Sequence, residues 1–93
     1  LMSLEKGRLT ERDRLLAEYA ELMSGTQTKI WEIVQEHASS FSEEDFRKMN
    51  TLESNRKEIL MRRPSTETQV EFLQTQINDL KQLLKDLQNF FQS

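Results

Sequence analysis

Apolar residues recur at three- and four-residue spacing along almost the whole 93-residue chain. Strict alternation of apolar and polar residues over a strand-sized window is absent, so the pattern predicts an all-α fold without a sheet. Two interruptions divide the pattern, and we expect helices over about residues 3–38, 43–62 and 66–91. The corresponding segments are an N-terminal helix (1–41), a middle helix (42–63) and a C-terminal coiled-coil helix (64–93).

The first interruption carries a strong signal for the start of a helix. Ser42 can accept a hydrogen bond from the backbone N–H of Asp45, and the acidic run 43–45 suits the positive end of the new helix. Phe41 and Phe46 flank this cap at the positions of a hydrophobic staple. We therefore expect a sharp bend with a defined entry angle into the middle helix.

The second interruption contains Pro64, which lacks a backbone donor and biases Arg63 away from helical geometry. Ser65 or Thr66 can cap the helix that follows. Two arginines also precede Ser65, as basophilic kinases prefer, which makes it a candidate phosphorylation site. Phosphate at a helix N-terminus would stabilise that helix. The simpler interpretation is a basic helix end followed by a polar cap.

The C-terminal helix carries the strongest pattern in the chain. Its apolar residues follow one another at intervals of 3, 4, 3, 4, 3 and 4 residues, which is the a/d repeat of a coiled coil. β-branched residues at the first two a positions and Leu at every d position favour a parallel homodimer. Leu83 and Phe90 broaden this stripe, so an intramolecular core is the alternative. The expected dimer interface comprises Val70, Leu73, Ile77, Leu80, Leu84, Leu87 and Phe91.

The N-terminal helix repeats this pattern less regularly, because polar groups interrupt it at Arg12, Thr26 and His37. A second apolar stripe near its end includes Trp31 and Val34, so this stretch should contact more than one neighbour. In the middle helix Met49, Leu52, Ile59 and Leu60 supply the apolar stripe, and Arg56 interrupts it.

Composition narrows the class of protein. With 31% charged residues, two Gly, one Pro and no Cys, the chain suits long helices and cannot form a disulfide framework. Leu1 precedes Met2, so we expect an excised piece of a larger protein. A net charge of −3 without a basic cluster argues against nucleic acid, and no apolar run is long enough for a membrane span. We expect a cytoplasmic or nuclear location.

Candidate chemistry is sparse. His37 is the only imidazole, and neither Cys nor a second His completes a zinc site. The two glycines are too far apart for a phosphate-binding loop, and the acidic run 43–45 does not match a calcium loop. We therefore expect no enzymatic activity, no cofactor and no metal.

These observations favour a structural coiled-coil segment, of the kind found in cytoskeletal scaffolds, that self-associates as a homodimer. The alternative is a monomeric three-helix adaptor whose groove accepts a helical protein partner. Unequal helix lengths argue against the alternative, because a compact bundle would leave much of the N-terminal helix uncovered.

Overall fold

The computed structural model describes residues 2–64 and 68–91, with side chains from residue 11 onward. Its elements are α1 (Met2–His37), a 3₁₀ turn (Ala38–Ser40), α2 (Glu43–Met61) and α3 (Gln69–Gln88). No strand occurs in these two ranges, and the all-α prediction is confirmed.

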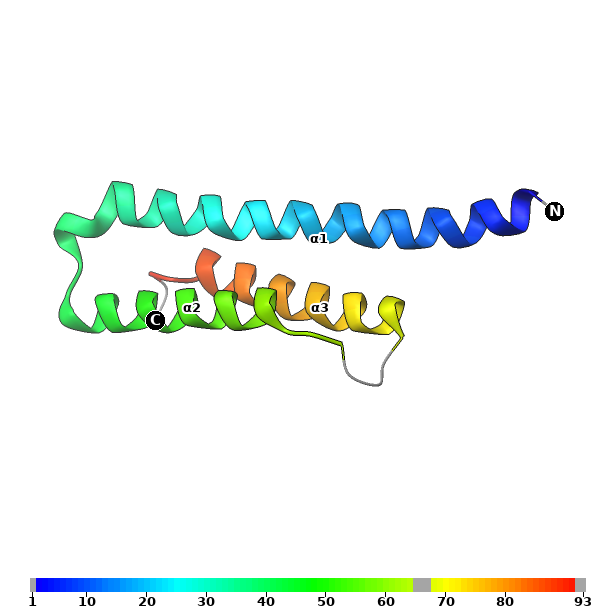
Figure 1. Ribbon diagram of the computed structural model, residues 1–93. Coiled ribbons are helices and arrows are strands. Elements are labelled where there is room, and N and C mark those ends of the chain that lie inside the picture. Colours follow the sequence, from blue (N-terminus) through cyan, green and yellow to red (C-terminus); the bar gives the residue numbers. More distant parts are fainter. Residues whose placement is uncertain (1, 65–67, 92–93) are drawn as a thin grey trace.

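The three helices fold back on one another instead of continuing as a rod. Figure 1 shows α2 running antiparallel to α1, and α3 returning parallel to α1. The molecule measures 58 × 25 × 20 Å, and the N-terminal turns of α1 extend past the ends of the two shorter helices. Unequal helix lengths therefore do not prevent the chain from folding into a bundle, contrary to the expectation from the sequence. A long helix can cover its apolar stretch and leave the remainder of its length beyond its neighbours.

The bend between α1 and α2 forms as the sequence predicts. The Ser42 hydroxyl accepts a hydrogen bond from the Asp45 backbone N–H at 3.2 Å, and the Asp45 carboxylate accepts one from the Ser42 N–H at 3.0 Å. This reciprocal pair is a capping box. The rings of Phe41 and Phe46 pack edge to face, 5.2 Å apart between centroids. Cap and staple together fix the direction in which α2 leaves the turn.

The start of α3 lies three residues beyond the predicted position. Thr68 is the N-cap, and its hydroxyl accepts a hydrogen bond from the Glu71 N–H at 3.2 Å. The expected caps, Ser65 and Thr66, lie outside the described residues, as does the candidate phosphorylation site at Ser65.

The core lies along α3. Its buried side chains pack against Leu15 and Ile33 of α1 and against Met49, Leu52 and Ile59 of α2. Leu80 is fully buried. The buried apolar residues of α3 are Leu73, Ile77, Leu80, Leu83 and Leu87, and Phe90, just beyond the end of the helix, is also buried.

The residues expected at a dimer interface therefore have partners within one chain. Leu73, Ile77, Leu80 and Leu87 are buried there, while Phe91 is 52% exposed. Val70 and Leu84 are partly buried. The broad stripe formed with Leu83 and Phe90 explains this arrangement, because it presents enough apolar width for two neighbouring helices. A parallel dimer through this stripe stays a prediction.

Candidate protein-interaction site

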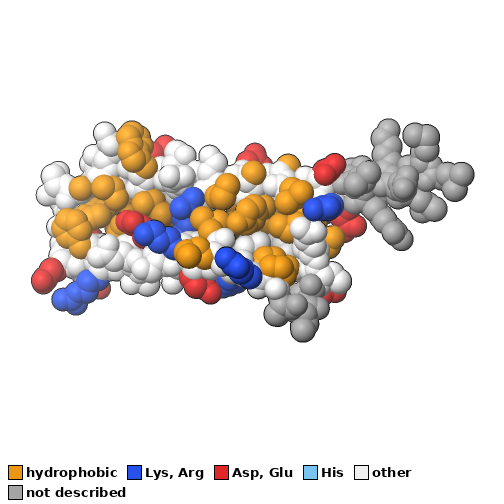
Figure 2. Space-filling model, in the orientation of Figure 1, with side chains coloured by type: hydrophobic (Ala, Val, Ile, Leu, Met, Phe, Trp, Pro, Cys, Tyr) orange, Lys and Arg blue, Asp and Glu red, His pale blue; other side chains and the backbone are white. Residues whose placement is uncertain are grey.

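A groove runs between α1 and α2. It encloses about 300 Å³ and is lined by Gln27, Ile30, Trp31, Val34, Glu53, Arg56 and Lys57. Figure 2 shows hydrophobic side chains forming a band along this face of the molecule, with charged groups of both signs within it. We call this feature the α1–α2 groove. It combines apolar walls with a few charged groups, as sites for partner helices commonly do.

An exposed apolar stripe of α1, which we call the outer seam, borders the groove. It consists of Leu16, Ala20, Met23, Gln27, Ile30 and Val34, at intervals of 4, 3, 4, 3 and 4 residues. Leu16, Met23 and Val34 are each between 37% and 39% exposed, and the neighbouring Trp31 is 61% exposed. This spacing allows side chains to interlock with a second helix. Ile30 packs partly against the core, and the other five seam residues are exposed in the part of the chain that the structure describes.

The outer seam differs from the face of α1 that contacts the core. The core face carries Leu15, Tyr19, Leu22, Thr26 and Ile33, which are buried or partly buried. The two stripes lie about a quarter turn apart, since successive residues of an α-helix are separated by about 100°. α1 therefore carries two apolar stripes, of which α2 and α3 cover chiefly one. The expected second neighbour near Trp31 stays a prediction.

The opposite wall of the groove belongs to α2. Phe46, Asn50, Glu53, Lys57 and Leu60 follow one another at intervals of 4, 3, 4 and 3 residues. Phe46 is 51% exposed, and Leu60 is partly buried. Within residues 11–64 and 68–91, neither Glu53 nor Lys57 forms an ion pair. The α2 residues that line the groove itself are the charged Glu53, Arg56 and Lys57, and Phe46 and Leu60 lie beyond its ends.

A polar contact crosses between the two helices behind the groove. The Arg56 Nε donates to the hydroxyl of Thr26 at 2.8 Å, and its Nη2 donates to the Met23 carbonyl oxygen at 2.7 Å. The same Thr26 hydroxyl donates to the Leu22 carbonyl at 2.8 Å, so this fully buried side chain is satisfied within its own helix. Thr26 and Arg56, which interrupt the apolar patterns of α1 and α2, thus contact each other. The contact places Arg56 at the level of residues 23–26 along α1.

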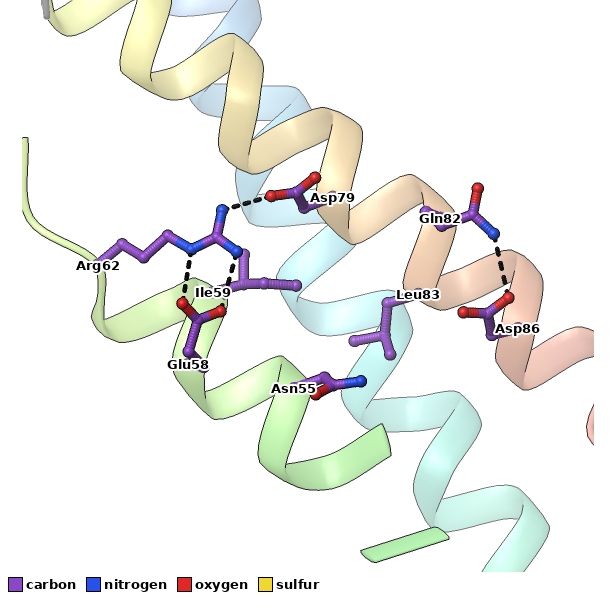
Figure 3. A pocket seen from close by; sticks show the side chains of 8 residues that line it. All are labelled: Asn55, Glu58, Ile59, Arg62, Asp79, Gln82, Leu83 and Asp86. Carbon is purple, nitrogen blue, oxygen red and sulfur yellow. Dashed lines mark hydrogen bonds and ion pairs between the residues drawn. The ribbon is translucent and has the colours of Figure 1, made fainter. Parts of the chain in front are cut away.

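The far side of α2 is held to α3 by an ion cluster (Figure 3). Arg62 donates to both carboxylate oxygens of Glu58, at 3.0 and 2.9 Å, and also to the carboxylate of Asp79. The hydrogen bond from Arg62 lowers the pKa of Glu58, and the two carboxylates raise the pKa of Arg62.

Near this ion cluster, the buried Gln76 amide of α3 donates to the Ile59 carbonyl of α2 at 2.9 Å. A shallow cavity of about 260 Å³ lies here, and most of its charged and polar groups are paired, Arg62 with Glu58 and Asp79 and Gln82 with Asp86. These contacts therefore hold α2 to α3 on the side of α2 away from the groove.

Aromatic side chains close the end of the bundle near the first turn. Phe41 stacks on Phe90 at 5.5 Å, and His37 meets Phe91 edge to face at 4.6 Å. The Lys48 ammonium lies 4.7 Å from the centroid of the Phe90 ring and donates to the carbonyl of that residue. His37 is thus engaged in packing. Its position gives no support to a catalytic role.

The described residues offer neither a metal site nor a membrane-spanning helix. Among the described side chains, those of residues 11–64 and 68–91, no group of three or more His, Cys, Asp or Glu is arranged to hold a metal ion. The acidic run 43–45 occupies the first turn of α2, where it complements the helix dipole. Of the helices described, none has the length and apolar character to cross a membrane.

Compared with protein-family models, with curated proteins and with solved structures, the chain matches none. The interpretation of function therefore depends on the geometry of the described surfaces.

Proposed function

We propose that the chain is a structural, non-enzymatic interaction module, in which a three-helix bundle binds a helix of another protein chain along the α1–α2 groove. One observation carries the proposal, namely the exposed outer seam from Leu16 to Val34. Scattered apolar residues are normal on a protein surface, but a continuous helical stripe typically marks a contact surface.

The physical basis is the packing of a fourth helix beside α1 and α2. A helix with apolar residues at three- and four-residue spacing would interlock with Leu16, Met23, Ile30 and Val34. Trp31 would contribute a large contact area at the rim, as aromatic residues often do in interfaces. Glu53, Arg56 and Lys57 would then favour a partner with polar groups at the matching level.

Assembly through this groove is better supported than assembly through α3. A parallel dimer through Leu73, Ile77 and Leu80 would require these side chains to leave a core in which they are almost fully buried. Each would lose roughly 1.5–3 kcal/mol of burial before any intermolecular contact formed. The outer seam is accessible without unfolding the bundle, so scaffold assembly is proposed to occur there.

A library of displayed amphipathic helices provides a test that does not require a known partner. Helices would be selected on the wild-type chain, and their binding then compared with a double variant carrying Met23→Asp and Val34→Asp. We expect selected helices to bind the wild type and shift the fluorescence of Trp31, the only tryptophan. The double variant should lose this binding, because two carboxylates would be desolvated in the contact.

A matched control carries Thr28→Asp and Gln35→Asp, which introduce the same charges at exposed positions outside the outer seam. This control should bind the selected helices as the wild type does. Circular dichroism would establish that both double variants are folded. Equal binding by the folded Met23→Asp, Val34→Asp variant would contradict the proposal.

A further inference from the structure

We propose that the partner of the face that carries the α1–α2 groove and the outer seam is a second copy of this chain, related to the first by a two-fold axis, so that α1 lies antiparallel over α1 and α2 antiparallel over α2 of the other copy. This inference depends on the proposed function, since it names the partner of the same groove. A two-fold dimer brings the same surface of both copies together in opposite directions. The apolar residues and the charges of this surface must therefore each fit their own copies.

The outer seam complements itself when the chain direction is reversed. Its six positions lie symmetrically about residue 25, so that an antiparallel copy aligns Leu16 with Val34, Ala20 with Ile30 and Met23 with Gln27. In each pair the two side chains differ: Leu16 is larger than Val34, Ile30 is larger than Ala20, and Met23 is apolar whereas Gln27 is polar. The small Ala20 side chain permits close approach of the two α1 helices opposite the larger Ile30.

Two of the three α2 charges that line the groove, Glu53 and Lys57, obey the same symmetry, whereas Arg56 lies next to the axis and faces its own copy. Glu53 and Lys57 lie at equal distances from residue 55, so reversal places each Glu53 opposite Lys57 of the second copy. The contacts of Arg56 with Thr26 and Met23 show that residues 55–56 of α2 lie level with residues 23–26 of α1. One axis therefore serves both helices. It pairs two apolar seams on α1 and forms two opposite-charge contacts on α2.

The available surface is sufficient for a weak dimer. From Leu16 to Val34 the outer seam is about 27 Å long, and two adjacent helices are about 20 Å wide, so each copy contributes a face of about 540 Å². The total of about 1,080 Å² lies just below the lower limit of roughly 1,200 Å² for specific, stable interfaces. Association should therefore depend on concentration and respond to changes of single charges.

Disulfide cross-linking tests the orientation, because the chain contains no Cys and each introduced thiol is unique. Leu16→Cys and Val34→Cys would be prepared in the full chain and oxidised separately and as a mixture. The two-fold axis predicts a disulfide between Leu16→Cys of one copy and Val34→Cys of the other. It predicts no disulfide between two Leu16→Cys chains, whose thiols would be about 27 Å apart along the helix. Self-linking of Leu16→Cys in place of the mixed product would overturn the inference.

Charge exchange tests the contact on α2, using sedimentation equilibrium over a wide range of concentration. Glu53→Lys and Lys57→Glu should each weaken dimerisation at least about tenfold, because each replaces two attractive contacts by repulsive ones. The double exchange should restore affinity close to that of the wild type. Glu32→Lys, at an exposed position on the opposite side of α1, is the matched control and should have little effect.

The outcomes separate this inference from the proposed function. Failure of the double exchange to restore dimerisation, or a folded wild-type chain that stays monomeric at the highest concentration, would overturn the two-fold dimer. Loss of helix binding in the Met23→Asp, Val34→Asp variant would still support a groove for a different partner. A dimer that forms unchanged in this folded variant would contradict the inference and show that another surface mediates association.

Discussion

The apolar residues of α3 and the outer seam of α1 have nearly the same spacing but different environments. In α3, Leu73, Ile77, Leu80 and Leu87 are buried between the other two helices. On α1, Leu16, Met23 and Val34 remain exposed. Spacing of three and four residues therefore indicates that a helix face packs against another helix, but it does not identify that helix. The number of neighbours within the chain decides which face stays accessible.

The largest expected effect distinguishes these two surfaces by their contribution to stability. Leu80→Ala should lower the free energy of unfolding by about 2–5 kcal/mol, because it leaves a cavity at a fully buried position. Met23→Ala on the outer seam should change it by less than about 1 kcal/mol. Urea unfolding of dilute chain, followed by circular dichroism, would measure both. Similar losses for the two variants would show that the outer seam is also covered in the single chain.

A smaller loss of stability is expected when the hydrogen bonds from Arg56 of α2 to α1 are removed. Arg56→Ala should destabilise the bundle by about 1–2 kcal/mol, since a partly buried guanidinium loses two hydrogen bonds to α1. A double-mutant cycle with Thr26→Val would isolate the side-chain pair. We expect a coupling energy of about 0.5–1 kcal/mol. Strict additivity of the two substitutions would mean that the contact does not link α1 to α2 energetically.

The smallest expected effect concerns the ion cluster on the side of α2 away from the groove. Arg62 lowers the pKa of Glu58, so the contribution of this carboxylate is present above the ordinary Glu pKa of about 4.3. That contribution is lost as the pH falls through the lowered folded-state pKa, because the unfolded chain binds the proton more readily. Glu58→Gln should therefore flatten the dependence of stability on pH slightly below about pH 5. Identical pH profiles of the wild type and the variant, measured by urea unfolding, would contradict this assignment.

Much of the fold follows from local chemistry that can be read along the chain. The cap at Ser42 and the staple of Phe41 and Phe46 involve residues within five positions of one another, so tertiary structure was not needed to find them. The continuity of α1 through Gly25 was also predictable, because a single glycine costs only about 1 kcal/mol in a helix. The start of α3 at Gln69 was less predictable, since several residues after Pro64 are possible caps.

The identity of the interacting helices could not be predicted in the same way. Thr26 and Arg56 are recognisable as polar interruptions, but only the fold shows that they contact each other. The outer seam was detectable as a spacing from Leu16 to Val34, although the more regular series in α3 suggested the interface instead. Whether an apolar stripe lies inside or outside depends on the path of the whole chain, which local periodicity does not specify.

The up-down-up path also determines how the bundle would respond to mechanical load. α1 and α3 are parallel, so the N-terminal end of α1 and the C-terminal end of α3 lie toward opposite ends of the molecule (Figure 1). A pull on these two points would slide α1 along α3 instead of peeling them apart one turn at a time. Such shear would strain the contacts of Leu15, Leu73 and Ile77 together with those nearer the first turn. The helix path thus favours resistance to stretching along the long axis.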